Sequence, residues 1–403
     1  MRSRLVSQAL ITVTGFNFCN LTVEVTHPGA DDHEWITIWL PPPEKWNAGF
    51  WYASGLTEGG LTLNGTIDPQ LGVFVLTNTR DPSSYNLELI KNFESRAIHD
   101  LAVVAKAEYF SAQYYPNDFD GILANAPGFD PAHLAMADAL PPLLMRETGV
   151  APPMRVFDAF QAAIVAACDG LDGAEDGLIG DPSKCSFDPD TLAGTTVACD
   201  APVENIIVTA THAALVAKIL QASLVFVANT TLGSDNKTLV PAPFIASQGF
   251  VGSLVKRDPT FNLLDLTIDE FYGKVQDVVA EVSPLVTLAK PDLPALVAYD
   301  GAISFRPELA SNMGEEETLH EFSRSFFVPG VGHCHPGVGP FPVDASGALI
   351  RWVEEGVEPD TLFAQTTTAE GRNVTRNLCP WPAVLRYKGG DVDEASSFDC
   401  SAA

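Results

Sequence analysis

The chain has 403 residues, of which 46% are hydrophobic and 18% are charged, and its formal net charge is −28. This composition is typical of a folded globular protein, and the length suffices for one large domain with an insertion. The strong negative charge argues against nucleic acid or an anionic membrane surface as a partner, and no apolar run reaches the length of a membrane span.

The N-terminal segment looks like a poor secretory signal. Arg2 and Arg4 precede an apolar stretch at residues 5–16, but polar residues interrupt the stretch and no clean cleavage site follows. We interpret it as a truncated or absent signal. Five Asn-x-Ser/Thr sequons nevertheless favour a secreted glycoprotein. They begin at Asn20, Asn64, Asn229, Asn236 and Asn373.

The first third of the chain predicts strands, then a helix and a further strand. Residues 20–25 and 34–40 are strand-like. The continuous apolar run at residues 71–77 is typical of a buried parallel strand. Residues 93–107 have helical spacing, and residues 119–124 predict a short core strand. This alternation indicates an α/β fold with a mostly parallel sheet.

The predicted secondary structure changes over residues 131–289. Helical stretches at 154–167 and 210–220 alternate there with much irregular sequence. We interpret residues 131–289 as an inserted lid domain.

The pattern of the sheet returns after the insertion. Residues 296–299 and 325–328 predict strands, and an amphipathic helix is expected at 347–356. Residues 17–130 and 290–403 therefore form one α/β domain around the lid.

The loop between Cys168 and Cys185 concentrates acidic residues and glycines. Its clustered carboxylates belong to Asp169, Asp172 and Asp176. Carboxylates at this density repel one another unless a cation lies among them, and calcium prefers such oxygen ligands. An EF-hand is excluded, because position twelve is Ser183 or Gly180 and not the required Glu. The flanking cysteines are placed to close the loop, and a solvated acidic turn is the alternative reading.

Six motifs occur in a characteristic order along the chain. They are Arg96-Ala-Ile-His99, Tyr115-Pro-Asn-Asp-Phe-Asp-Gly-Ile-Leu-Ala-Asn-Ala-Pro127, the loop 168–185, Val328-Pro-Gly-Val-Gly-His-Cys334, Trp352-Val-Glu-Glu-Gly356 and Leu378-Cys-Pro-Trp-Pro382. Together they resemble the tannase and feruloyl esterase family. These are secreted carboxylic ester hydrolases with an α/β-hydrolase fold, a mostly parallel sheet and a calcium-binding lid.

The resemblance implies a ligand set and a disulfide pattern. Calcium would be a structural ion, bound by the side chains of the three loop aspartates and by two main-chain oxygens. These residues are Asp169, Asp172, Ala174, Asp176 and Leu178. The implied disulfides join Cys168 to Cys185 and Cys379 to Cys400. Cys19, Cys199 and Cys334 then stay single, and the family's usual partner of Cys334 stands beside the catalytic serine.

The catalytic serine that the resemblance implies is missing from this sequence. An α/β-hydrolase presents its serine on a tight strand-to-helix turn with the pattern Gly-x-Ser-x-Gly or a close variant. No such motif occurs in this sequence. By motif order it belongs between the helix 93–107 and Tyr115, where Ser111 has no adjacent glycine and reads as a surface helix serine. We therefore expect that the elbow and the central strand before it have been deleted.

The other two catalytic groups have candidates. The resemblance assigns the general base to His333, which follows an apolar run and a Pro-Gly turn, with His335 as a weaker competitor. Asp300 is the candidate acid, and Ile303 preserves the family's Asp-x-x-Ile spacing. In the alternative alignment, Asp300 and Gly301 replace the family's His-Gly and the acid is lost.

Two functions follow. By descent the chain is a serine-type hydrolase of phenolic esters of the gallate or ferulate type. The alternative is a non-catalytic pseudoenzyme or truncated gene product, since a base without a nucleophile activates nothing. The expected partner is a small aromatic ester, and the particular ester and the oligomeric state are left open. A metal-dependent hydrolase is disfavoured, because no histidine cluster has zinc-like spacing.

Overall fold

The structure is a computed structural model of the whole chain. It describes residues 2–13, 16–29, 34–40, 61–62, 77–78, 81–85, 120–125, 131–198, 205–222, 228–258, 260–274, 295–300, 323–332 and 337–402. The predicted helix at 93–107 and most of the predicted strand at 71–77 lie outside the described residues.

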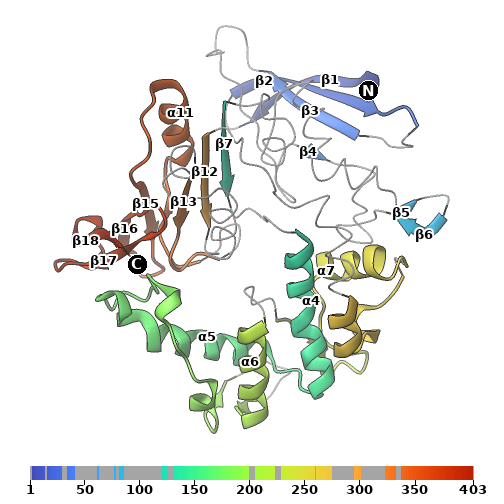
Figure 1. Cartoon of the computed structure of the whole chain (residues 1–403), viewed down its shortest axis with the longest axis vertical. Helices are drawn as coiled ribbons and strands as arrows, with labels where there is room; N and C mark the ends of the chain where they lie inside the picture. The colour runs from blue at the N-terminus through green and yellow to red at the C-terminus, as the bar shows by residue number, and fades with distance from the viewer. Residues whose placement is uncertain are drawn as a thin grey trace.

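The N-terminal strands form an antiparallel sheet in the order β1 (Arg2–Val13), β2 (Phe16–Thr26), β3 (Glu34–Leu40) and β4 (Leu61–Thr62). The strands predicted at 20–25 and 34–40 are confirmed. The strand β1, which overlaps the apolar stretch at residues 5–16, pairs with β2 along its whole length. Figure 1 shows this sheet in blue at one end of the molecule.

A short hairpin follows, in which β5 (Thr77–Asn78) pairs antiparallel with β6 (Asp81–Tyr85). Thr77 therefore lies in an antiparallel hairpin, where the sequence predicted the end of a parallel strand.

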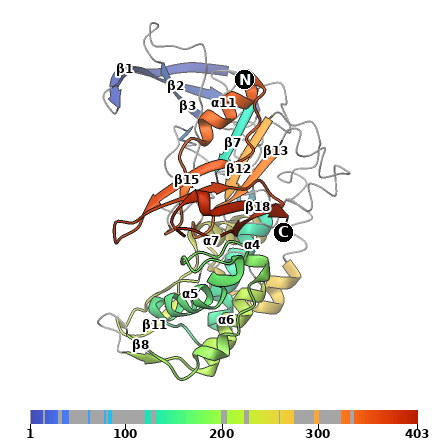
Figure 2. The same ribbon diagram turned by 90° about the vertical axis from the view of Figure 1, so that its left-hand side faces the viewer.

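Three parallel strands form the second sheet, in the order β13 (Ser323–Phe327), β12 (Ala295–Asp300) and β7 (Gly121–Asn125). All three were predicted from their apolar runs. The helix α11 (Ala345–Glu355) lies against this sheet (Figure 2). At Gly121 the approach is close, since an added Cβ would lie 2.5 Å from Val353 Cγ2.

The helix α11 matches its prediction, with its ends fixed locally. The side chain of Asp344 accepts the Gly347 N–H at 3.1 Å as the N-cap. Gly356 has a φ of 69° at the C-terminal end, a conformation that glycine adopts without strain. The buried face carries Ala348, Leu349 and Trp352.

The segment between β7 and β12 is largely helical. Its main helices are α4 (Pro131–Thr148), α5 (Met154–Cys168), α6 (Ala210–Ala222) and α7 (Ile245–Phe250), and the last continues as a π-helix at Val251–Val255. The helices predicted at 154–167 and 210–220 are confirmed. Two small hairpins complete the segment: β8 (Thr196–Val197) with β9 (Ile206–Ile207), and β10 (Thr230–Leu232) with β11 (Leu239–Pro241).

Short 3-10 turns connect these helices and hairpins. They lie at Asp169–Asp172, Pro182–Lys184, Pro189–Leu192 and Leu263–Asp265, and one more is at Ala395–Ser397 near the C-terminus. Among the described residues, no helix is long and apolar enough to cross a membrane.

The C-terminal strands form two small antiparallel sheets. One contains β14 (Phe341–Pro342), β15 (Leu362–Thr367) and β16 (Asn373–Leu378), and the other pairs β17 (Ala383–Tyr387) with β18 (Phe398–Ala402).

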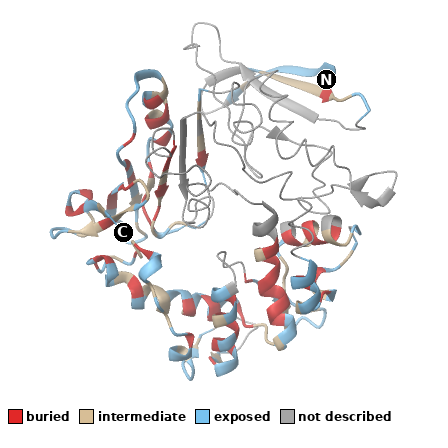
Figure 3. Cartoon of the chain, viewed as in Figure 1, coloured by how far each residue is buried: buried red, intermediate tan, exposed pale blue. Residues whose placement is uncertain are grey.

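Among the described residues, buried hydrophobic side chains form two clusters, which we call the first and the second core. The first lies among the helices, with Leu143, Phe157, Phe160 and Leu215 fully buried (Figure 3). The second joins the parallel sheet, α11 and the C-terminal strands, and it contains Phe326, Trp352, Leu378 and Phe398. It also contains Ala174 of the acidic loop. The loop therefore contributes a side chain to the core of the sheets, while its 3-10 turn at Asp169–Asp172 also contacts α5.

Candidate active site and acidic loop

The carboxyl edge of the parallel sheet brings two predicted catalytic positions together in the backbone. Asp300 is the last residue of β12 and stands opposite Phe327, the last residue of β13. In parallel sheets the strands end at one edge, which is where ligands bind in open α/β folds. The chain enters the helical segment from this same edge, because β7 ends there at Asn125.

The loop that bears His333 starts where β13 ends, and its base is closed. Val331 forms a β-bridge with Gly337, and the carbonyl oxygen of Gly330 accepts the N–H groups of Val338 at 2.9 Å and Gly339 at 3.0 Å. Gly330 has a φ of 72°, which a side chain would strain. The base of the loop is thus held at the edge that Asp300 occupies.

His333 itself, with Cys334 and His335, lies outside the described residues, as do Ser111 and Cys199. For Asp300 the structure describes the backbone only. The sequence predictions for base and acid therefore stay predictions about side chains, although the backbone brings their two segments to one edge.

The acidic loop is folded by its own carboxylates. Asp169 Oδ1 accepts the N–H groups of Asp176 at 3.1 Å and Gly177 at 2.9 Å. Asp172 Oδ1 accepts from Ala174 at 3.0 Å, and Asp176 Oδ1 accepts from Leu178 at 2.9 Å. One oxygen of each aspartate is thus used to fix the backbone.

Glycines let this backbone turn. Gly173 and Gly177 have φ values of 99° and 85°, in the left-handed region. Gly180 lies against the Asp172 carboxylate so closely that a Cβ would collide with it.

The carboxylates of the loop are crowded and partly desolvated. Burial raises the pKa of Asp172, and the carboxylates of Asp176 and Asp169 raise it further. Burial likewise raises the pKa of Asp176, although Arg376 opposes the shift. Such shifts are expected where carboxylates crowd one another in a desolvated site.

The donor chemistry of the loop suits calcium, but the side chains are not closed around one point. Within the described part of the chain, no group of three or more His, Cys, Asp or Glu side chains is arranged to hold a metal ion. Asp176 Oδ2 instead forms an ion pair with Arg376. Aspartate oxygens and backbone carbonyls are calcium's usual ligands, so the residue types of the loop fit the ion. In this structure, however, the carboxylate of Asp176 is oriented toward Arg376.

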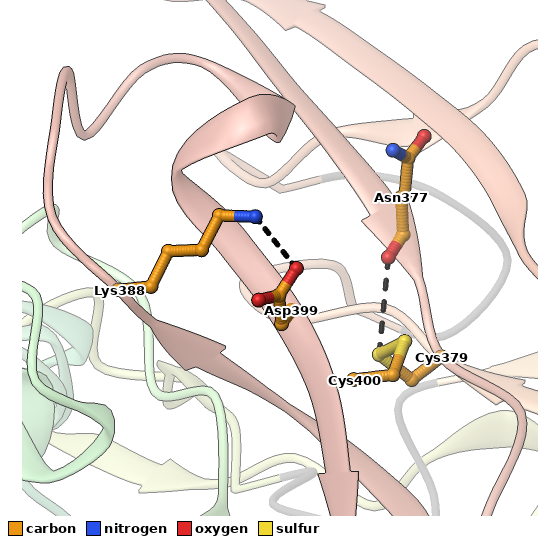
Figure 4. Close-up of a disulfide and its surroundings, with 5 residues drawn as sticks. All are labelled: Asn377, Cys379, Lys388, Asp399 and Cys400. Carbon is orange, nitrogen blue, oxygen red and sulfur yellow. Dashed lines mark hydrogen bonds and ion pairs between the residues drawn. A yellow bond between two sulfur atoms is a disulfide. The ribbon is translucent and has the colours of Figure 1, made fainter.

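Both predicted disulfides are formed. Cys168 and Cys185 close the acidic loop, with 5.3 Å between their Cα atoms, and Cys379 and Cys400 join the C-terminal strands, with 5.6 Å. Figure 4 shows the second bridge beside the ion pair of Lys388 and Asp399. Among the described cysteines, Cys19 is a free and exposed thiol.

Sequence reasoning missed the two arginines that hold the loop. Arg376 of β16 pairs with Asp176, and Arg386 of β17 pairs with Asp181 at 3.3 Å. The partners lie 200 or more residues apart in sequence, so no spacing rule connects them. The sequence signal that could have pointed to Arg376 is its position among the apolar residues that face one side of the strand ending at Leu378.

The comparisons with known proteins agree with this fold. The family model described as "Tannase and feruloyl esterase" matches residues 108–238 and 294–401. A "Probable feruloyl esterase" of Arthroderma benhamiae is 33% identical over 469 residues, covering 96% of this chain and 86% of the relative. A "Probable feruloyl esterase B" of Emericella nidulans is 26% identical over 78% of this chain and 71% of its own.

Solved structures show the same fold at lower identity. Tannin acyl hydrolase from Aspergillus niger has a TM-score of 0.78 at 20% identity, over 100% of this chain and 90% of that one. Feruloyl esterase B from Aspergillus oryzae has a TM-score of 0.73 at 19% identity, over 99% of this chain and 97% of that one.

The three-stranded parallel sheet, together with the likeness to these solved structures, is consistent with an α/β-hydrolase-like fold. The relatives make its class that of the carboxylic ester hydrolases. Within that class, the chain belongs to the tannase and feruloyl esterase family.

Proposed function

We propose that the chain accepts phenolic esters of the gallate or ferulate type at the carboxyl edge of the parallel sheet. The observation that carries this proposal is the closed base of the His333 loop beside the end of β12, where Asp300 lies. The names of the relatives, feruloyl esterase and tannin acyl hydrolase, support the substrate class.

The chemistry proposed for this edge is acyl transfer. A serine hydroxyl attacks the ester carbonyl while His333 takes its proton and later returns it to the leaving alcohol. Asp300 fixes the tautomer of the imidazole, and backbone N–H groups stabilise the oxyanion. This chain has candidate residues for the general base and for the acid, His333 and Asp300, but it has no candidate for the nucleophile.

We infer that this chain has lost ordinary turnover with the missing elbow. The alignment with the Arthroderma relative extends over 469 residues, more than the 403 of this chain, so the relative carries segments that are absent here. A lost central strand and elbow would account for part of that excess. The chain then acts as a pseudoenzyme that binds aromatic esters, or it is the product of a truncated gene.

An ester assay tests this proposal. Purified protein is assayed on methyl gallate, methyl ferulate and p-nitrophenyl acetate, with His333→Ala as the matched control. We expect equal background rates for the two proteins. Turnover that disappears in His333→Ala would show that a nucleophile is present and that the elbow was not lost. Methyl ferulate binding, followed by its fluorescence, tests the ester site separately, and no binding would contradict it.

We also propose that the acidic loop binds calcium as a structural ion. The side chains of Asp169, Asp172 and Asp176 would hold it, with the main-chain oxygens of Ala174 and Leu178. The raised pKa values and the left-handed glycines support this assignment. Chelation should lower the melting temperature of the wild type, and Asp172→Asn should remove that response. A wild type insensitive to chelation would contradict the site.

The organisation and location of the chain complete the proposal. Residues 131–289 form an inserted lid and residues 17–130 with 290–403 the catalytic domain, a division supported by the two separate cores. The two disulfides favour an oxidising, extracellular location. The exposed sequons at Asn229, Asn236 and Asn373 are accessible to glycosylation. Peptide mapping of protein secreted from a eukaryotic host tests this, and unmodified exposed sequons would contradict it.

A further inference from the structure

Arg376 is the most deeply buried charged group that contacts the acidic loop. Its side chain and that of Asp176 are only 2% and 3% exposed, and the two form an ion pair. Its second guanidinium nitrogen, Nη1, donates to the Thr375 carbonyl at 2.6 Å. The guanidinium also lies over the Phe398 ring, 4.0 Å from its centroid. These contacts fix the side chain of Arg376, which extends from β16, against Phe398 of β18 and against the acidic loop.

A second ion pair to the same loop provides an internal comparison. Arg386 reaches Asp181 at 3.3 Å, but its side chain is 26% exposed. Asp181 also receives Lys184 at 3.0 Å and the Ser183 hydroxyl at 2.5 Å. Asp181 therefore keeps a cation if Arg386 is removed. Among the described residues, the only cation paired with Asp176 is Arg376.

Both oxygens of Asp176 are engaged in this structure. Oδ1 accepts the Leu178 N–H, and Oδ2 faces Arg376. Asp169 and Asp172 likewise direct one oxygen each to backbone N–H groups. A buried carboxylate that loses its counter-charge is strongly destabilising, so without Arg376 the charge of Asp176 has to be neutralised by another cation or by a proton while the loop stays packed.

We propose that Arg376 is the resident counter-ion of Asp176, a positioning residue that holds the loop on the C-terminal strands without metal and competes with calcium for the same negative charge. The inference rests on the calcium site proposed above. Competition for one charge makes the coupling between the two cations negative, and such coupling is reciprocal. Removing Arg376 should then increase what calcium contributes to stability.

The test compares three full-length proteins: the wild type, Arg376→Gln and the matched control Arg386→Gln. The melting temperature of each is measured in excess EDTA and in excess calcium. In EDTA, the melting temperature of Arg376→Gln should fall further below that of the wild type than the melting temperature of Arg386→Gln does, because Arg376→Gln leaves Asp176 unpaired. The rise produced by calcium should be at least about twice as large in Arg376→Gln as in the wild type. In Arg386→Gln, the rise in melting temperature produced by calcium should equal the rise in the wild type.

Each other outcome has one meaning. A calcium-induced rise in Arg376→Gln no larger than that of the wild type would overturn the competition while leaving the calcium site in place. No response in any of the three proteins would refute the calcium site and the competition together. If Arg376→Gln folds only with calcium, the proposal is supported directly.

If Arg376→Gln folds under neither condition, Arg376→Lys takes its place. Its shorter side chain keeps a charge but loses the forked contacts with Asp176 and Thr375. A calcium-induced rise above that of the wild type is then expected, and an equal or smaller rise would overturn the proposal.

Discussion

The helices of the proposed lid and the acidic loop are neighbours in sequence, yet they are stabilised in different ways. The helix α5 buries Val156, Phe157 and Phe160 in the first core, as its spacing predicts. The loop begins directly after it, but its Ala174 packs in the second core. Ion pairs with Arg376 and Arg386 hold the loop there, so it is anchored to strands some 200 residues further along the chain.

The difference suggests how the proposed lid is attached to its domain. The helices bury side chains in the first core, whereas the loop is connected to the C-terminal strands, because both of its arginine partners belong to them. If this view is correct, perturbing each region should leave the other largely intact.

The largest expected effect is a cavity in the lid core. Phe160 is 1% exposed, and Phe160→Ala should lower the free energy of unfolding of the lid by about 3–5 kcal/mol. Urea denaturation followed by circular dichroism measures this. The matched variant Phe326→Ala should weaken the second core instead. One shared transition, shifted equally by both variants, would show that the cores unfold as a single unit.

A smaller effect is expected from opening the disulfide of the acidic loop. The double variant Cys168→Ser and Cys185→Ser should cost about 3 kcal/mol, because the bridge closes a loop with a sequence separation of 17. Limited proteolysis should then cut within residues 169–184 before the lid helices. Cutting first in the helices would contradict the separate anchoring of the loop.

The smallest effect concerns a carboxylate buried in α4. Asp138 is 5% exposed, its Oδ1 has no hydrogen-bond partner among the described residues, and burial raises its pKa to about 6. The folded state therefore favours the neutral form, whose stabilisation is complete below about pH 4 and is lost as the pH rises through 6.

Asp138→Asn should accordingly gain up to about 3 kcal/mol over the wild type above pH 7, with the gain vanishing near pH 4. Melting temperatures across this range measure the gain, and Asp158→Asn, on the exposed side of α5, is the control. A gain that does not depend on pH would contradict the assignment to ionisation of Asp138.

Local patterns explain what could be predicted from the sequence. The helices α5, α6 and α11 and the strands β7, β12 and β13 follow from apolar spacing within a few residues. The disulfides followed from resemblance, because cysteine pairing cannot be deduced from spacing alone.

Long-range partners explain what was missed. The strand β1 was not predicted from the sequence, because only its pairing with β2 defines it as a strand. The ion pair of Arg376 with Asp176 could not be found, since the two residues lie 200 positions apart and no local pattern links Arg376 to the acidic loop. Thr77 was assigned to a parallel strand on hydrophobicity, while its pairing with Tyr85 is antiparallel.

The central claim is that the edge beside Asp300 keeps an ester site without a nucleophile. A fluorophosphonate probe, which labels activated serines covalently, tests this most directly when intact-protein mass spectrometry compares the wild type with His333→Ala. The account predicts no adduct on either protein while methyl ferulate still binds. A stoichiometric serine adduct on the wild type that His333→Ala abolishes would contradict it.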